Sequence, residues 1–122
     1  MKKILLIDDD KLFLDELSEL LGSGGYDVTA LSVSKEAVAV VVEYEPDLIL
    51  LDLKMEELNG FQIAIELNAN DDTRSIPIIG MTGYFTGVGD QRVVKGSGIK
   101  DCLIKPLNPD EVLKTIRSVL GE

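Results

Sequence analysis

The sequence contains no histidine, and cysteine occurs only once, as Cys102. Histidine is the commonest protein ligand for transition metals and the commonest general base, so its absence argues against a zinc site and against serine–histidine chemistry. A single cysteine cannot form an internal disulfide, which favours a reducing compartment. We therefore expect a cytoplasmic protein.

Long hydrophobic segments and basic patches are also missing. The apolar run at residues 4–7, which follows two lysines, is much too short for a signal peptide or a membrane span. Only 12 lysines and arginines stand against 22 aspartates and glutamates, so the net charge is −10. This imbalance argues against direct binding to nucleic acid or to an anionic membrane.

The remaining composition is that of a globular chain. Of the 122 residues, 45% are hydrophobic and 28% are charged. This length fits one domain over residues 1–122 and allows a hydrophobic core without disulfides. Since no repeat, low-complexity tract or linker interrupts the sequence, we expect a single soluble domain.

Short apolar runs recur along the chain and predict buried strands. Four of them are nearly continuous instead of alternating, which is typical of strands that helices cover on both faces of a parallel sheet. These runs are residues 4–7, 47–51, 76–81 and 102–104, and a weaker fifth strand fits residues 26–32.

Helices are predicted between the strands, at residues 11–21 and 60–68 among others. The first should end at Gly22, because glycine is favoured at helix C-termini. Its predicted buried stripe consists of Phe13, Leu17, Leu20 and Leu21. The corresponding residues of the second are Phe61, Ala64 and Ile65.

The last helix has the clearest signals. Asn108 is expected to cap it, Pro109 suits its first position, and Glu111 can complete a capping box. Leu107 and Val112 have the spacing of a hydrophobic staple. The predicted buried stripe consists of Val112, Ile116, Val119 and Leu120.

Two segments are ambiguous. Residues 37–44 are rich in β-branched side chains, which favours a strand. They lie between two strand candidates that need a crossover, so we assign a helix with Ser34 as its N-cap. Residues 84–98 contain four glycines. Each glycine costs about 1 kcal/mol in a helix interior, so we expect only a short helix there, near residues 90–95.

This alternation predicts an α/β fold, a doubly wound five-stranded parallel sheet with helices on both faces. Sites in such folds form at the carboxyl ends of the strands. Asp8 and Asp9 follow the first strand, and Asp52 ends the third. Thr82 follows the fourth and Lys105 follows the fifth, so these five side chains should converge.

Taken one at a time, these residues have structural explanations. Asp10, the third of three consecutive aspartates, is expected to cap the following helix. A strand-end aspartate often forms a turn, and a lysine before proline often belongs to a loop. All of them at strand ends in a consistent order favours a functional site.

The predicted cluster has a specific chemistry. Asp8, Asp9 and Asp52 repel one another unless they share a cation, and oxygen ligands suit Mg²⁺. Lys105 can balance further negative charge, and Thr82 can donate a hydrogen bond to a phosphoryl oxygen. One carboxylate is then left to attack phosphorus as a nucleophile.

The motifs ILLIDDD, LILLDLKMEELNG, MTGY and LIKP resemble, in this order and along the whole chain, the receiver domain of bacterial two-component response regulators. The resemblance implies a flavodoxin-like (β-α)5 fold and a phosphoacceptor, not an enzyme beyond self-catalysed phosphotransfer and autodephosphorylation. It implies that Asp52 takes a phosphoryl group from a sensor histidine kinase or a phosphotransfer protein. It also implies Mg²⁺ at Asp8, Asp9, Asp52 and the backbone carbonyl of Lys54.

The same resemblance implies that Thr82 is the switch hydroxyl and Lys105 the phosphate-binding lysine, with a cis peptide before Pro106. The sequence departs from the family pattern at Glu56, where proline is usual, and at Cys102, where an aromatic residue is usual. We therefore expect that ordering of residues 84–98, instead of movement of an aromatic side chain, transmits the signal.

Other functions remain as alternatives. A flavodoxin-type nucleotide binder needs a phosphate loop where Asp8 and Asp9 stand, and a haloacid-dehalogenase-type hydrolase needs a second aspartate where Lys54 stands. The main alternative is a phosphorylation-independent pseudo-receiver that only binds partners, and the presence of all five site residues argues against it. If the chain ends at residue 122, we expect it to act by protein contact, as stand-alone chemotaxis or phosphorelay regulators do.

Overall fold

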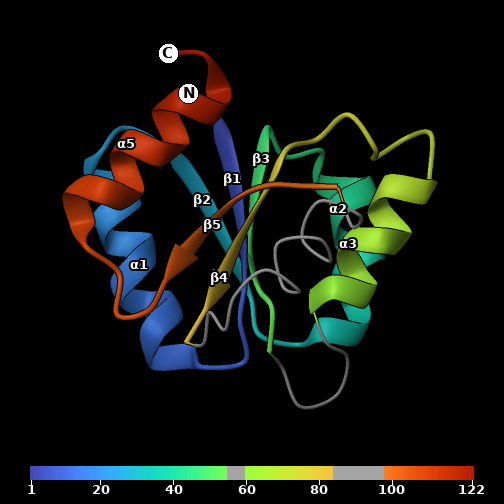
Figure 1. The fold of residues 1–122 in the computed structure, drawn as a ribbon, viewed down its shortest axis with the longest axis horizontal. Coiled ribbons are helices and arrows are strands. Elements are labelled where there is room, and N and C mark those ends of the chain that lie inside the picture. The colour runs from blue at the N-terminus through green and yellow to red at the C-terminus, as the bar shows by residue number, and fades with distance from the viewer. Residues whose placement is uncertain (55–59, 84–97) are drawn as a thin grey trace, which may run out of the picture.

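The computed structural model describes residues 1–54, 60–83 and 98–122. Five parallel strands form one sheet in the order β2-β1-β3-β4-β5 (Figure 1). The strands are β1 (Lys3–Ile7), β2 (Asp27–Leu31), β3 (Leu48–Asp52), β4 (Ile78–Thr82) and β5 (Ile99–Ile104). The predicted doubly wound parallel sheet is therefore confirmed.

Helices cover both faces of the sheet. The helices α1 (Lys11–Ser23) and α5 (Pro109–Leu120) lie on one face, and α2 (Ala37–Tyr44) and α3 (Gly60–Ala69) lie on the other (Figure 1). Successive residues of a strand point to opposite faces. In β1, Ile4 and Leu6 pack in the cluster under α1 and α5, whereas Leu5 and Ile7 pack in the cluster under α2 and α3. Burial on both faces explains the continuous apolar runs.

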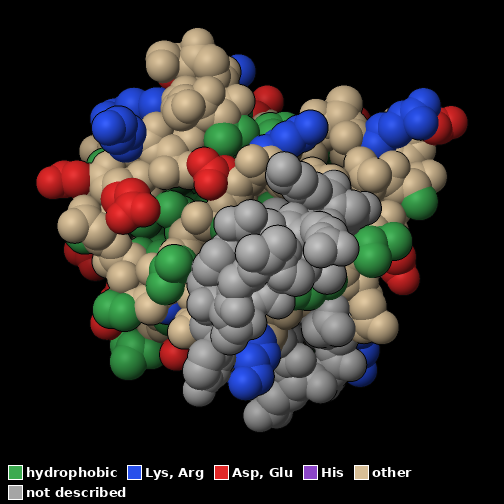
Figure 2. All heavy atoms as spheres, in the orientation of Figure 1, with side chains coloured by type: hydrophobic (Ala, Val, Ile, Leu, Met, Phe, Trp, Pro, Cys, Tyr) green, Lys and Arg blue, Asp and Glu red, His purple; other side chains and the backbone are tan. Residues whose placement is uncertain are grey.

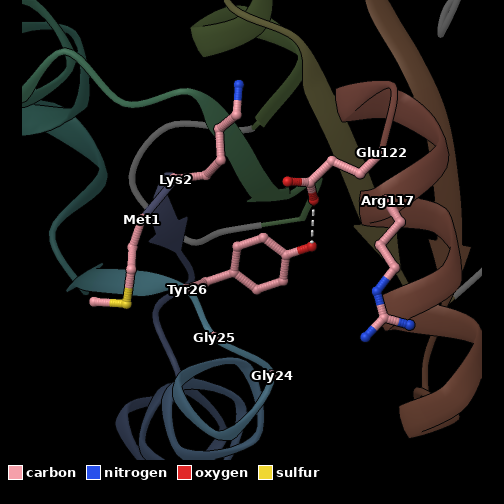
Figure 3. Close-up of a pocket in the computed structure, with 7 residues that line it drawn as sticks. All are labelled: Met1, Lys2, Gly24, Gly25, Tyr26, Arg117 and Glu122. Atoms are coloured by element: carbon pink, nitrogen blue, oxygen red, sulfur yellow. Dashed lines mark hydrogen bonds between the residues drawn. The ribbon is translucent and has the colours of Figure 1, made fainter.

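Polar contacts connect the elements at the amino end of the sheet, where both termini lie (Figure 1). The Tyr26 hydroxyl donates a hydrogen bond of 2.9 Å to Oε1 of Glu122, which joins the start of β2 to the end of α5 (Figure 3). The backbone N–H of Lys3 donates to Oδ2 of Asp47 at 2.7 Å. Nζ of the same lysine donates to the carbonyl of Tyr44 at 2.8 Å. These pairs satisfy polar groups where strands and helices meet.

The strand boundaries differ from the predicted ones by up to three residues. β5 begins at Ile99 instead of residue 102, because its early residues Lys100 and Asp101 are exposed on an edge strand and do not form an apolar run. β4 begins at Ile78 instead of residue 76, and β3 extends to Asp52.

Two predictions about α1 were wrong in detail. Gly22 lies inside the helix, which ends at Ser23 with Gly24 as its C-cap. The buried residues are Leu14, Leu17 and Leu21, while Phe13 and Leu20 are only partly buried against the same cluster. The side-chain stripe is therefore rotated toward Leu14, which the sequence analysis left out.

Predictions about α2 and α3 also need correction. Residues 37–44 form a helix as predicted, but its N-cap is Glu36, whose side chain makes no capping hydrogen bond. Ser34 instead begins a short 3-10 helix, η1 (Ser34–Glu36). In α3, Ile65 is 52% exposed, and Ile63 and Leu67 take the buried positions. Phe61 is partly buried beside them.

The N-cap and the first-turn proline predicted for α5 are confirmed, but only half of its predicted buried stripe is fully buried. The Asn108 side chain accepts hydrogen bonds from the backbone N–H groups of Asp110 and Glu111, and Pro109 occupies the first turn. Val112 and Ile116 are buried, and Val119, Leu120 and Leu107 pack against their cluster. The predicted helix near residues 90–95, the ordering of residues 84–98 and the role of Glu56 fall almost wholly on residues 55–59 and 84–97, outside the described residues.

Among the described residues, no helix combines the length and the apolar character that a membrane crossing requires.

Candidate functional site

The carboxyl end of the sheet brings the predicted site residues together. Nζ of Lys105 lies 2.7 Å from Oδ2 of Asp8 and 3.8 Å from Oδ2 of Asp52. One carboxylate oxygen from each of Asp8, Asp9 and Asp52 lies within 4.8 Å of the other two. Thr82 is held beside them, because its carbonyl accepts a hydrogen bond of 2.8 Å from the backbone N–H of Lys105. The side chains of Asp8, Asp9, Asp52 and Lys105 thus converge as predicted, and Thr82 is joined to Lys105 through the backbone.

Strand register explains why residues so far apart in sequence meet. Ile7 of β1 pairs with Leu51 of β3, so the next residues, Asp8 and Asp52, lie side by side at the carboxyl edge of the sheet. The backbone N–H of Asp8 still donates to the carbonyl of Leu31 at 3.1 Å, which keeps Asp8 in line with the strands. The register of the sheet thus brings these two carboxylates to the same edge.

The three consecutive aspartates have separate roles in the local structure. Oδ1 of Asp8 accepts a hydrogen bond of 2.9 Å from the backbone N–H of Asp10. Oδ1 of Asp10 accepts one of 3.2 Å from the backbone N–H of Phe13 and caps α1, as predicted. Asp9 is exposed and points its carboxylate at the cluster. Asp10 therefore does not belong to the metal-type cluster.

Asp52 is a buried carboxylate in an acidic setting. Burial raises its pKa to about 6, and the charges of Asp8 and Asp9 act in the same direction. The backbone N–H of Lys54, 3.1 Å from Oδ1, and the ammonium of Lys105 oppose this rise. A carboxylate with such a pKa is largely ionised at neutral pH, and its charge is only partly compensated.

The cluster contains three carboxylates and one ammonium, so it retains an excess of negative charge. The side chains of Asp8 and Asp52 are 1% and 7% exposed, which leaves water little room to screen that charge. Oxygen donors within 4.8 Å of one another suit a hard divalent cation. The residues present therefore fit a Mg²⁺ ion.

Two residues that the sequence analysis did not place in the site lie against it. A Cβ on Gly60 would stand 2.2 Å from the carbonyl oxygen of Asp52, so only glycine allows α3 to begin so close to β3. The ring centroid of Phe13 lies 4.2 Å from Nζ of Lys105. Neither was visible in the sequence, because a glycine before a helix and an aromatic residue on a helix face have ordinary structural explanations.

Two features that the resemblance singled out, the peptide before Pro106 and Cys102, lie in or directly after β5. The peptide between Lys105 and Pro106 is cis, as the resemblance implied. Cys102 is half-buried and packs against the cluster under α2 and α3. Burial and the charge of Asp101 raise the pKa of its thiol, so the thiol is protonated at neutral pH.

Comparison with known families and proteins agrees with this geometry. The family model of the response regulator receiver domain matches residues 4–117. The polar-differentiation response regulator DivK of Brucella anthropi is 29% identical over 121 residues, which cover 99% of this chain and 98% of that protein.

Solved structures give the same result. The chemotaxis protein CheY4 of Vibrio cholerae superposes with a TM-score of 0.91 at 28% identity, covering 98% of both chains. The signal receiver domain of the DNA binding response regulator merR of Colwellia psychrerythraea gives a TM-score of 0.89 at 31% identity, covering both chains completely.

Proposed function

The chain belongs to the family of response regulator receiver domains, and on this premise we propose that it is a phosphoacceptor that carries its phosphoryl group on Asp52. Receiver domains form a signalling family and are phosphorylated by histidine kinases or phosphotransfer proteins. The observation that carries the proposal is the setting of Asp52, a buried carboxylate 3.8 Å from the Lys105 ammonium and beside two further carboxylates.

The proposed transfer is a displacement at phosphorus. A carboxylate oxygen of Asp52 attacks the phosphorus of a phosphohistidine, the P–N bond breaks, and the imidazole leaves with the bonding electrons and takes up a proton. Lys105 attracts the transferred phosphoryl oxygens, and the Thr82 hydroxyl donates a hydrogen bond to one of them. The pKa of about 6 leaves Asp52 mostly ionised, and therefore nucleophilic, at neutral pH.

The acidic cluster supports a Mg²⁺ requirement for this transfer. Asp8, Asp9, Asp52 and the backbone carbonyl of Lys54 would hold the ion. When bound, it would neutralise the carboxylates and the phosphoryl oxygens, which otherwise repel each other.

The partners follow from the same proposal. The phosphoryl donor is a sensor histidine kinase or a phosphotransfer protein, and the phosphorylated state presents a changed surface to a further protein. The net charge of −10 disfavours direct contact with nucleic acid or an anionic membrane. On the coloured part of the face in Figure 2, lysine and arginine side chains stand apart from one another instead of forming a patch.

We place the protein in the cytoplasm, as one domain over residues 1–122.

Phosphorylation with a small-molecule donor tests the proposal directly. The protein is incubated with acetyl phosphate and Mg²⁺, and the phosphorylated residue is mapped by mass spectrometry after borohydride reduction. We expect one modified residue, Asp52. Asp52→Asn should take up no phosphoryl group, while Asp72→Asn, a matched change of an exposed aspartate, should be phosphorylated normally.

Two results would contradict the proposal. Equal phosphorylation of Asp52→Asn would remove Asp52 as the acceptor. A wild-type protein that takes up no phosphoryl group from acetyl phosphate or from histidine kinases would support the pseudo-receiver alternative.

A further inference from the structure

We propose that Phe13 is a positioning residue that holds the Lys105 ammonium beside the carboxylates at the carboxyl end of the sheet; this rests on the role proposed above for Lys105. Nζ of Lys105 lies 4.2 Å from the centroid of the Phe13 ring, within the range at which an aromatic face attracts a cation. The same nitrogen lies 2.7 Å from Asp8 and 3.8 Å from Asp52. The ring and the two carboxylates thus all lie close to the same ammonium.

Phe13 is itself held in place. The backbone N–H of Phe13 donates to Oδ1 of Asp10 at 3.2 Å, which fixes the first turn of α1. Its side chain packs against the cluster under α1 and α5. With Leu17 and Leu20 it also lines a mainly apolar groove of about 370 Å³, which Lys105 borders. Asp10 contributes no ligand, but by capping α1 it helps to fix the position of Phe13.

Besides its contacts with Asp8 and Asp52, the Lys105 ammonium is held only through a long side chain. The backbone N–H of Lys105 donates to the carbonyl of Thr82 at 2.8 Å, but four rotatable bonds separate the ammonium from that anchor. The side chain is 25% exposed and has a path to water. A favourable contact at the ring lowers the number of rotamers that the lysine samples.

An aromatic ring suits this place better than another carboxylate. It attracts the ammonium without adding formal charge to a cluster that already holds Asp8, Asp9 and Asp52. A cation bound by Asp8 would compete with Lys105 for that carboxylate, but it would not compete for the ring. Phe13 therefore keeps the ammonium within reach of Asp52 when Asp8 is otherwise engaged.

The first test measures the contact itself, without metal or phosphoryl donor. Protons above an aromatic face are shielded, so the ε-methylene protons of Lys105 should resonate upfield of their usual position in the NMR spectrum of the full chain. Phe13→Leu should remove this shift, and Phe13→Tyr, which keeps the ring, should retain it. Lys3, which lies 5.0 Å from the Tyr44 ring centroid, is the internal reference and should not change.

The second test measures the consequence. With acetyl phosphate and Mg²⁺, the phosphorylation rate of Phe13→Leu should fall roughly threefold to tenfold. Phe13→Tyr should react at nearly the wild-type rate, which separates the effect of the aromatic face from that of side-chain volume. Unfolding curves establish that both variants are folded under the assay conditions.

Three results would overturn the inference: an unchanged Lys105 shift in Phe13→Leu, an unchanged rate in that variant, or equal losses in the Leu and Tyr variants. If the wild-type protein takes up no phosphoryl group, the proposed function fails. The Lys105 chemical shift then decides by itself whether Phe13 positions the ammonium.

Discussion

The two ends of the sheet differ in how their charged side chains are arranged. At the amino end, Tyr26 is paired with Glu122 and the backbone N–H of Lys3 with Asp47, so the polar groups support the fold. At the carboxyl end, Asp8 and Asp52 are buried with one ammonium between them, and a third carboxylate lies close by. The strands therefore begin among hydrogen-bonded polar groups and end in a cluster with excess negative charge.

Each end also contains a lysine above an aromatic ring. Nζ of Lys3 lies 5.0 Å from the Tyr44 ring and donates to a backbone carbonyl. Nζ of Lys105 lies 4.2 Å from the Phe13 ring and contacts two carboxylates. The two contacts differ in the second partner of the cation. At Lys3 this partner is a backbone carbonyl, which suits a structural contact, whereas at Lys105 it is a pair of carboxylates, which suits a functional site.

Glycine substitutions should give the largest difference between the two ends. A Cβ on Gly60 would stand 2.2 Å from the backbone oxygen of Asp52, so Gly60→Ala must displace β3 or α3. Such overpacking costs about 3 kcal/mol of the free energy of unfolding. Urea denaturation measures this loss.

The matched control lies near the amino end. Gly22 is inside α1, and a Cβ there would meet nothing within 4 Å. Gly22→Ala should therefore stabilise the protein by about 0.5 kcal/mol, since alanine favours a helix over glycine. Equal destabilisation by both substitutions would show that the close approach of Gly60 has no special cost.

Neutralising the Asp52 carboxylate should stabilise the metal-free protein. Burial raises the pKa of Asp52 from 3.8 to about 6, so the folded state binds a proton more tightly than the unfolded state does. Wild-type stability should accordingly fall as the pH rises through this window. Above pH 7 the ionised carboxylate costs about 2–3 kcal/mol, which Asp52→Asn should recover.

The pH dependence of this gain is its check. Chemical denaturation with chelator present should show the advantage of Asp52→Asn in full at pH 7.5, and it should shrink toward zero near pH 4. A gain that is independent of pH would point to packing instead of charge.

A smaller effect is expected at the amino end. Tyr26→Phe removes the 2.9 Å hydrogen bond to Glu122, which is exposed and can bind water instead. The free energy of unfolding should fall by about 0.5–1 kcal/mol. Phosphorylation by acetyl phosphate should continue at the wild-type rate, because this bond lies at the opposite end of the sheet. A slower reaction in Tyr26→Phe would show that the two ends of the sheet are coupled, and it would contradict the distinction between them.

Much of this arrangement could be predicted from the sequence because strand ends in a parallel sheet share one edge. Asp8, Asp52 and Lys105 were placed by that rule alone, and their convergence is confirmed. The capping roles of Asp10 and Asn108 followed from local chemistry and are also confirmed. Local signals and sheet topology agree at these positions.

What could not be predicted depends on contacts between elements. Phe13 had the spacing of a core residue, and only the relative placement of α1 and the end of β5 sets its ring above Lys105. Gly60 is restricted by a backbone oxygen of another element. Ile65 was predicted to be buried, but the rotation of α3 on the sheet, which local spacing does not set, leaves it exposed.

The central claim is that the uncompensated charge at the carboxyl end forms a cation site, and a Mg²⁺ titration of stability tests it most directly. Asp9→Asn and Asp10→Asn each remove one charge from the same run, but only Asp9 belongs to the cluster, and asparagine at position 10 can still cap α1. At a hundredfold excess over Kd, Mg²⁺ should stabilise the wild-type protein by about 2.7 kcal/mol. Asp10→Asn should keep this gain and Asp9→Asn should lose most of it; equal gains in both variants would contradict the account.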